Sequence, residues 1–126
     1  ILFTKILHKC ISLCSFFTTG SFANKIWPTD KNAILVGKET DTVTLKCSYE
    51  SSSSNYILLY WYKQNPNSPL QFLLYKGARS SSGSERTPDD RRLEAQTTTD
   101  STTLTIRGLK LSDSALYHCA LRDVAQ

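Results

Sequence analysis

From residue 41 onward, apolar and polar residues alternate in short runs. In the first run, Val43, Leu45, Cys47 and Tyr49 fall on one side of an extended chain and the polar residues between them fall on the other. A period of two is typical of a strand with one buried face. The same pattern predicts strands at 41–49, 57–64, 70–76, 93–97, 102–106 and 114–121. After residue 23 no helical period appears, and 110–114 can form one helical turn at most.

Turn-forming residues separate these runs. Residues 51–55 are four serines and an asparagine, 65–69 hold two prolines and two asparagines, and Gly108 interrupts the pattern near the end. The segment 77–88 is rich in Ser, Gly and Arg, which predicts a loop with room for a short edge strand. Seven or more short strands joined in this way predict an all-β fold built as a two-sheet sandwich.

The cysteines and aromatic residues narrow this fold class. Trp61 follows Cys47 by fourteen residues, and Tyr117 precedes Cys119 by two. An inter-sheet disulfide, a tryptophan packed on it and a tyrosine at this spacing are typical of an immunoglobulin variable-type Greek-key sandwich. We therefore predict a Cys47–Cys119 disulfide, with two unpaired buried thiols as the alternative. The predicted core residues are Trp61, Leu104 and Tyr117.

The first 23 residues have the pattern of a secretory signal peptide. Lys5 and Lys9 precede a short apolar run at 10–17, and the small residues Ser21 and Ala23 follow it. We expect residues 1–23 to be a signal peptide and 24–126 the domain, with a buried N-terminal helix as the alternative. The sequence contains no Met, so we expect its start to be truncated.

The net charge and the cysteine count also bound the function. The formal charge is +4, and Lys5 and Lys9 belong to the predicted signal peptide. The remaining excess of positive charge is small and dispersed, which disfavours nucleic-acid binding. Cys10 and Cys14 would leave with the signal peptide, so Cys47 and Cys119 have no further cysteine or histidine at the spacing of zinc ligands. We expect no metal and no cofactor.

One outward face of the predicted sandwich should be unusually apolar. Because Trp61 faces the core, Tyr62 and Gln64 should face outward on the same strand. His118 should also face outward, since both of its neighbours face inward. A histidine in this position is expected to fill an interface and not to act as a catalytic base.

The next strand should extend this face. Leu70, Phe72 and Leu74 share one side of strand 70–76, which points outward if Leu73 lies in the core. A contiguous apolar patch of this kind usually marks a protein–protein interface, although loops that cover the face are the alternative. The expected partner-chain interface is Tyr62, Gln64, Leu70, Phe72 and His118.

The loops at one end of the sandwich have the composition of a binding surface. Ser, Asn, Tyr, Gly and Arg are the residues that antibody-like paratopes use, with a flexible linker as the alternative for the serine run. The expected antigen-binding residues are Ser51, Ser52, Ser53, Ser54, Asn55, Tyr56, Gly77, Ala78, Arg79, Leu121, Arg122 and Asp123. We expect no catalytic residue. A secreted hydrolase on a β-sandwich would need a clustered nucleophile and base, and His118 is the one histidine after residue 23.

Three segments resemble a T-cell receptor alpha or delta variable segment. They are Trp61-Tyr62-Lys63-Gln64, the stretch 113–119, and Cys119-Ala120-Leu121-Arg122. The resemblance covers roughly residues 24–123. It implies a variable domain that binds a peptide held by a major histocompatibility molecule and pairs with a beta or gamma chain. It also implies a place at the cell surface through constant and transmembrane regions that this sequence does not contain.

The sequence departs from that family at its end. The Phe-Gly-x-Gly strand of rearranged receptors is absent, so we expect a sandwich that lacks its final G strand and leaves an edge unpaired, as in an unrearranged germline segment. An immunoglobulin light-chain domain or an innate V-set receptor domain is the alternative.

Overall fold

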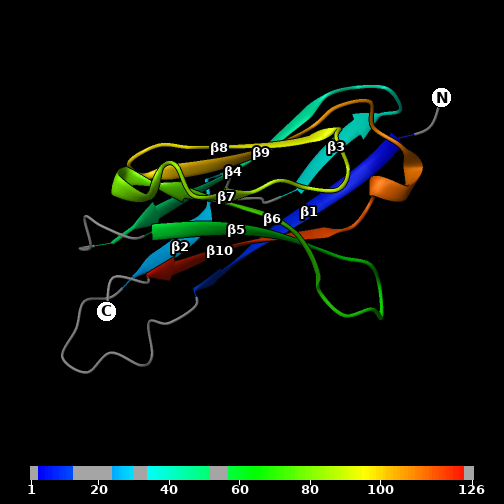
Figure 1. Cartoon of the computed structure of the whole chain (residues 1–126). Coiled ribbons are helices and arrows are strands. Elements are labelled where there is room, and N and C mark those ends of the chain that lie inside the picture. Colours follow the sequence, from blue (N-terminus) through cyan, green and yellow to red (C-terminus); the bar gives the residue numbers. More distant parts are fainter. Residues whose placement is uncertain (1–2, 13–23, 30–33, 52–56, 124–126) are drawn as a thin grey trace.

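The computed structural model describes residues 3–12, 24–29, 34–51 and 57–123. Within these ranges the chain forms two β-sheets that face each other (Figure 1). One sheet has the strand order β3-β1-β10-β5-β6-β7, and the other has the order β2-β4-β9-β8. The strands are β1 (Phe3–Ser12), β2 (Lys25–Pro28), β3 (Ile34–Lys38), β4 (Val43–Glu50), β5 (Ile57–Gln64), β6 (Gln71–Ala78), β7 (Glu85–Arg86), β8 (Leu93–Thr97), β9 (Ser101–Ile106) and β10 (Leu116–Asp123), and the short 3₁₀ helices are η2 (Arg79–Ser81) and η3 (Leu111–Asp113).

The strands predicted from alternation are all present. Along β4 and the first half of β5, every second residue is buried, as a period of two requires. β5 and β8 have the predicted bounds, and the other predicted strands shift by one or two residues. β7 is the short edge strand for which 77–88 left room, and η3 is the helical turn expected within 110–114.

β2 and β3 were not predicted. Each has one buried position, Ile26 in β2 and Gly37 in β3, so neither shows an alternating apolar pattern. Trp27, Ile34 and Val36 are instead exposed large apolar residues. β2 is positioned by antiparallel pairing with β4, which places Ile26 opposite Tyr49. The strand conformation of β2 therefore depends on pairing with β4 and not on its own pattern of apolar residues.

β1 changes the picture of the sheet edge. It lies between β3 and β10, parallel to β10 with Leu7 opposite Leu116 and Ser12 opposite Leu121. The edge of β10 that we expected to be unpaired is therefore covered in this chain. Among the described residues, no strand follows β10. The assignment of residues 1–23 as a signal peptide stays a prediction. In the chain that still contains these residues, Phe3–Ser12 form strand β1.

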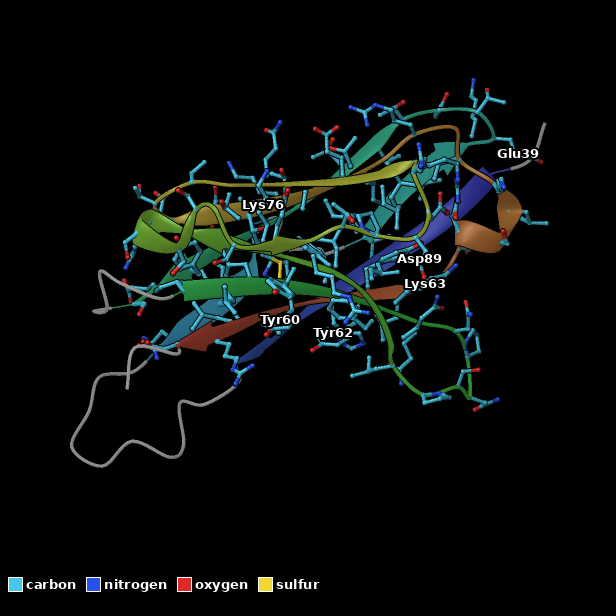
Figure 2. The ribbon with its side chains drawn as sticks, viewed as in Figure 1. Glu39, Tyr60, Tyr62, Lys63, Lys76 and Asp89 are labelled. Atoms are coloured by element: carbon cyan, nitrogen blue, oxygen red, sulfur yellow. A yellow bond between two sulfur atoms is a disulfide. The ribbon has the colours of Figure 1, made fainter. Side chains whose placement is uncertain are left out.

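The core lies between the two sheets and is centred on the predicted disulfide. Cys47 of β4 and Cys119 of β10 are bonded across the sandwich, with 6.7 Å between their Cα atoms, and the bond is visible between the sheets in Figure 2. Trp61 is fully buried, and its Nε1–H donates a hydrogen bond of 3.2 Å to Thr102 Oγ1. Leu104 is fully buried as well. The indole thus satisfies its polar atom within the core, as a buried tryptophan requires.

The end of the sandwich next to η3 is fixed by a polar cluster. The Tyr117 hydroxyl donates to the backbone oxygen of Asp113 at 2.7 Å, which forms a tyrosine corner. The Asp113 carboxylate accepts two bonds from Arg92, of 2.8 and 2.9 Å, and a third of 2.8 Å from the Lys110 amide. Asp113 is 4% exposed, so this bidentate pair lies deeper than a surface ion pair.

Candidate functional site: an aromatic face and a loop end

Four aromatic rings gather on the outer face of β5 and β6. Tyr60 stacks on Tyr62 with 6.2 Å between the ring centroids, and its ring lies 5.2 Å from that of Tyr75. Phe72 meets Tyr62 edge-on at 6.0 Å and Tyr75 at 6.4 Å. Figure 2 shows Tyr60 and Tyr62 side by side on the side of β5 that is turned away from the second sheet. We call Tyr60, Tyr62, Phe72 and Tyr75 the aromatic face.

A β-bulge explains which residues of β6 reach this face. Tyr60 lies opposite Tyr75 and Trp61 opposite Leu74, but Tyr62 lies opposite Phe72, so the register shifts at this point and Leu73 has no residue directly opposite. The extra residue at the bulge makes the side chains after it point to the opposite faces from those that a regular strand would give. Leu74 is therefore only 2% exposed and belongs to the core. The expectation that Leu74 points outward was therefore wrong.

The polar residues of the expected interface lie at the edge of the aromatic face. His118 is opposite Tyr62 in the sheet, and its Nε2 lies 3.0 Å from Gln64 Oε1. Because the amide oxygen accepts, the histidine Nε2 is the donor. The Gln64 amide nitrogen donates in turn to the Ser68 carbonyl oxygen at 3.1 Å. His118 is only 6% exposed, so it packs into this part of the sheet.

Two further residues extend this region. Leu70 directly precedes β6, two residues before Phe72, and its apolar side chain is 43% exposed. The Arg86 guanidinium lies 5.3 Å from the centroid of the Phe72 ring. The structure thus places Tyr62, Gln64, Phe72 and His118 on one sheet, with Leu70 just before β6, and adds Tyr60, Tyr75 and Arg86. The alternation of β5 could have identified Tyr60, whereas Tyr75 depends on the bulge.

The structure places the expected antigen-binding residues in different environments. Residues 52–56 lie outside the described residues. Gly77 and Ala78 are buried in β6, and Leu121 is fully buried in β10, so these three residues lie beneath the loops and do not face outward. Arg122 is exposed, and its Nη1 donates to the Tyr60 hydroxyl at 3.3 Å. Ser51 and Asp123 are half-buried.

Arg79 is bonded to two other segments of the chain. It begins η2, directly after β6, and its guanidinium reaches backbone oxygens of two other segments. It is half-buried, not fully exposed.

Within the described ranges, the structure holds no cluster of three His, Cys, Asp or Glu side chains that could bind a metal ion. A hollow of about 450 Å³ borders Gln64 and is lined by residues of the β5–β6 turn and the start of β10, none of them ionisable. In the same part of the chain no helix is long and apolar enough to cross a bilayer.

The family model of the immunoglobulin V-set domain matches residues 31–126 of the sequence. The chain belongs to the immunoglobulin V-set family. This agrees with the Cys47–Cys119 bridge, the buried Trp61 and the Tyr117 corner of the structure. The fold class predicted from the sequence is confirmed.

Known V-set proteins similar to this one include receptor segments and light chains. Human T cell receptor alpha variable 14/delta variable 4 is 35% identical over 86% of this chain and 90% of its own length. Human T cell receptor alpha variable 3 is 37% identical, over 68% of this chain and 71% of its own length. The rabbit Ig kappa chain V region K-25 is 36% identical over 62% and 66%. This V-set domain is thus similar to antigen-receptor variable domains, which are receptor domains and not enzymes.

Proposed function

We propose that this V-set domain is the antigen-recognition domain of a T-cell receptor alpha or delta chain, and that it pairs with a beta or gamma variable domain. The aromatic face is the observation that supports pairing. Its four rings lie on the outer side of the β5–β6 pair and remain only half-buried in the single chain. Aromatic residues are enriched at the centre of protein interfaces, where a partner completes their burial.

The residues around the rings fit the same role. The His118–Gln64 bond fixes the half-buried Gln64 side chain beside the rings, so Gln64 can contact a partner with little ordering cost at binding, while the buried His118 supports it from within the sheet. Leu70 adds exposed apolar surface and Arg86 adds a cation next to Phe72. This combination of apolar centre and polar border is typical of a specific interface.

We propose a peptide held by a major histocompatibility molecule as the ligand and the cell surface as the location. Both are supported by the similarity to T cell receptor alpha and delta variable segments over most of the chain. The contact surface would be the end of the sandwich that carries Ser51, η2 and the end of β10, and it would include residues 52–56.

A light-chain variable domain is the second candidate function. The similarity to rabbit kappa V regions favours it. Co-expression separates the two candidates, because a receptor alpha segment should be captured by a beta-chain variable domain and a light chain should be captured by a heavy-chain variable domain.

Pairing can be tested on residues 24–126 extended by a joining segment, whose strand can then take the edge of β10 that β1 covers here. Tyr62→Ala combined with Phe72→Ala should weaken co-purification with a beta-chain variable domain by at least about tenfold, because truncation of central aromatic residues typically costs more than 1 kcal/mol each. Trp27→Ala is the matched control, since Trp27 is an aromatic residue that is 40% exposed on the other sheet. Equal capture of the double variant and the control would reject the interface.

A further inference from the structure

We infer that Arg79 is a positioning residue that joins three surface segments at the loop end into one preorganised unit. The segments are the start of the loop that follows β4, the η2 turn, and the turn 98–100 between β8 and β9. The inference rests on the proposed recognition function, and it makes the turn 98–100 a support for the recognition surface. It also gives Arg79 a role different from the direct antigen contact that the sequence predicts.

The guanidinium of Arg79 forms the link itself. Its Nε and Nη2 donate to the backbone oxygen of Thr99 at 3.2 and 2.8 Å, and its Nη1 donates to the backbone oxygen of Ser51 at 3.0 Å. Thr99 lies 20 residues from Arg79 and Ser51 lies 28 residues away. One planar, permanently charged group therefore holds two carbonyls of separate segments, a geometry that lysine cannot reproduce.

The buried ring of Tyr49 packs against the Arg79 guanidinium on the core side. The ring of Tyr49 is 3% exposed, and the Arg79 Cζ lies 5.3 Å from its centroid. The Tyr49 hydroxyl donates to the Thr98 carbonyl oxygen at 2.8 Å, so the same turn is bonded from both sides. The backbone amide of Tyr49 also donates to the Asp100 oxygen at 2.9 Å. Arg79 thus rests on a core residue that is itself tied to the turn 98–100.

The backbone around the η2 turn is constrained toward the turn 98–100. Arg79 has a φ of 57°, in the left-handed region that non-glycine residues seldom adopt. The Gly77 amide donates to Ser84 O at 2.7 Å, and the Gly77 oxygen accepts from Thr97 Oγ1 at 2.8 Å. A disfavoured φ persists where surrounding contacts hold it, and here these bonds close the loop around Arg79.

The turn 98–100 is rigid enough to serve as the anchor. Thr98 Oγ1 lies 2.7 Å from Ser101 Oγ and donates to Asp100 Oδ1 at 3.0 Å, and the Thr98 amide donates to the Ser101 oxygen at 2.8 Å. A change at Arg79 should therefore alter the order of all three segments together. Preorganised loops bind with a smaller entropy cost, so the effect belongs to recognition and not to folding alone.

Amide hydrogen exchange of the full chain, followed residue by residue by NMR, tests this inference. In Arg79→Ala and Arg79→Lys, we expect the amides of Tyr49, Gly77, Thr98 and Ser84 to exchange about tenfold or more faster, because each variant loses the charge-assisted bonds between segments. The β4–β9 core amides of Leu45 and Leu104 should exchange at the wild-type rate.

The controls separate this role from general stability. Arg107→Ala removes an exposed arginine whose Nη2 donates to Glu94 at 2.7 Å, and it should leave the exchange rates of the Tyr49, Gly77, Ser84 and Thr98 amides unchanged. Uniform acceleration that includes the core amides, acceleration confined to η2, or full protection in Arg79→Lys would each overturn the inference. Exchange needs no antigen and no partner domain, so this result stands apart from the pairing test of the proposed function.

Discussion

At the scale of single residues, the buried carboxylate of Asp113 illustrates how hydrogen bonds stabilise a charge in the folded protein. Burial by itself would raise the pKa of its carboxyl, and it is the largest single influence. The bonds from Arg92 and from the Lys110 amide together outweigh burial and lower the pKa below its usual value. The pKa of Asp90 is lowered as well, chiefly by a bond from the Arg92 amide. The charged form of Asp113 is therefore favoured in the folded protein.

A pH dependence of stability follows from Asp113. Its folded pKa is depressed, so its contribution is complete above the unfolded pKa of about 4 and is lost as the pH falls through the folded pKa. Asp113→Asn should lower the free energy of unfolding by roughly 2–3 kcal/mol at pH 7, because it leaves Arg92 partly buried with a weaker partner. Urea unfolding between pH 7 and pH 2 measures both effects. Asp89→Asn, at an exposed site, is the control, and parallel pH profiles for wild type and Asp113→Asn would contradict the account.

At the scale of elements, alternation was a sound guide wherever one face of a strand is buried. It predicted β4 to β6 and β8 to β10, and with them the positions of Trp61, Tyr62 and Gln64. It failed at β2 and β3, which each bury one residue, and on β6, where the bulge reverses the two faces after Phe72. A bulge arises from pairing between strands, so no period along one strand reveals it.

For the expected interface, the inward position of Trp61 was enough to place Tyr62 and Gln64 on the outer side of β5, and four of the five expected residues lie on one sheet. Leu70 lies just before β6, and the role of the five residues in pairing stays a prediction. The loop end was predicted by composition alone, and composition does not say whether a side chain points out. Composition thus did not reveal that Ala78 and Leu121 are core residues, or that the Arg79 side chain donates to backbone oxygens.

The turn from β6 into η2 gives a prediction at the scale of elements. A Cβ at Gly77 would lie 1.9 Å from the backbone oxygen of Ser81, whereas a Cβ at Gly83 would meet nothing within 4 Å. Gly77→Ala should destabilise the protein by about 1–3 kcal/mol because the backbone of η2 has to move. Gly83→Ala is the matched control and should stay within about 0.5 kcal/mol of wild type. Thermal unfolding compares the two, and equal melting temperatures would show that the turn does not have this close packing.

At the scale of the whole molecule, the two ends and the two faces have separate roles. The η3 end is held by the Arg92–Asp113 pair, and the opposite end presents loops joined through Arg79. The sheet of β5 and β6 has the aromatic face on its outer side, while Trp27 is exposed on the other sheet. β1 covers the second edge of β10 in this chain, so a chain without residues 1–23 would need another strand there to avoid an exposed edge.

Hydroxyl-radical footprinting of residues 24–126, extended by a joining segment and mixed with a beta-chain variable domain, tests the central claim most directly. Aromatic side chains report their own exposure, so Tyr60, Tyr62, Phe72 and Tyr75 should become protected on pairing while Trp27 reacts as before. Protection of Trp27 with unchanged reactivity of the four rings would contradict the account, as would unchanged reactivity of all five in a complex that forms.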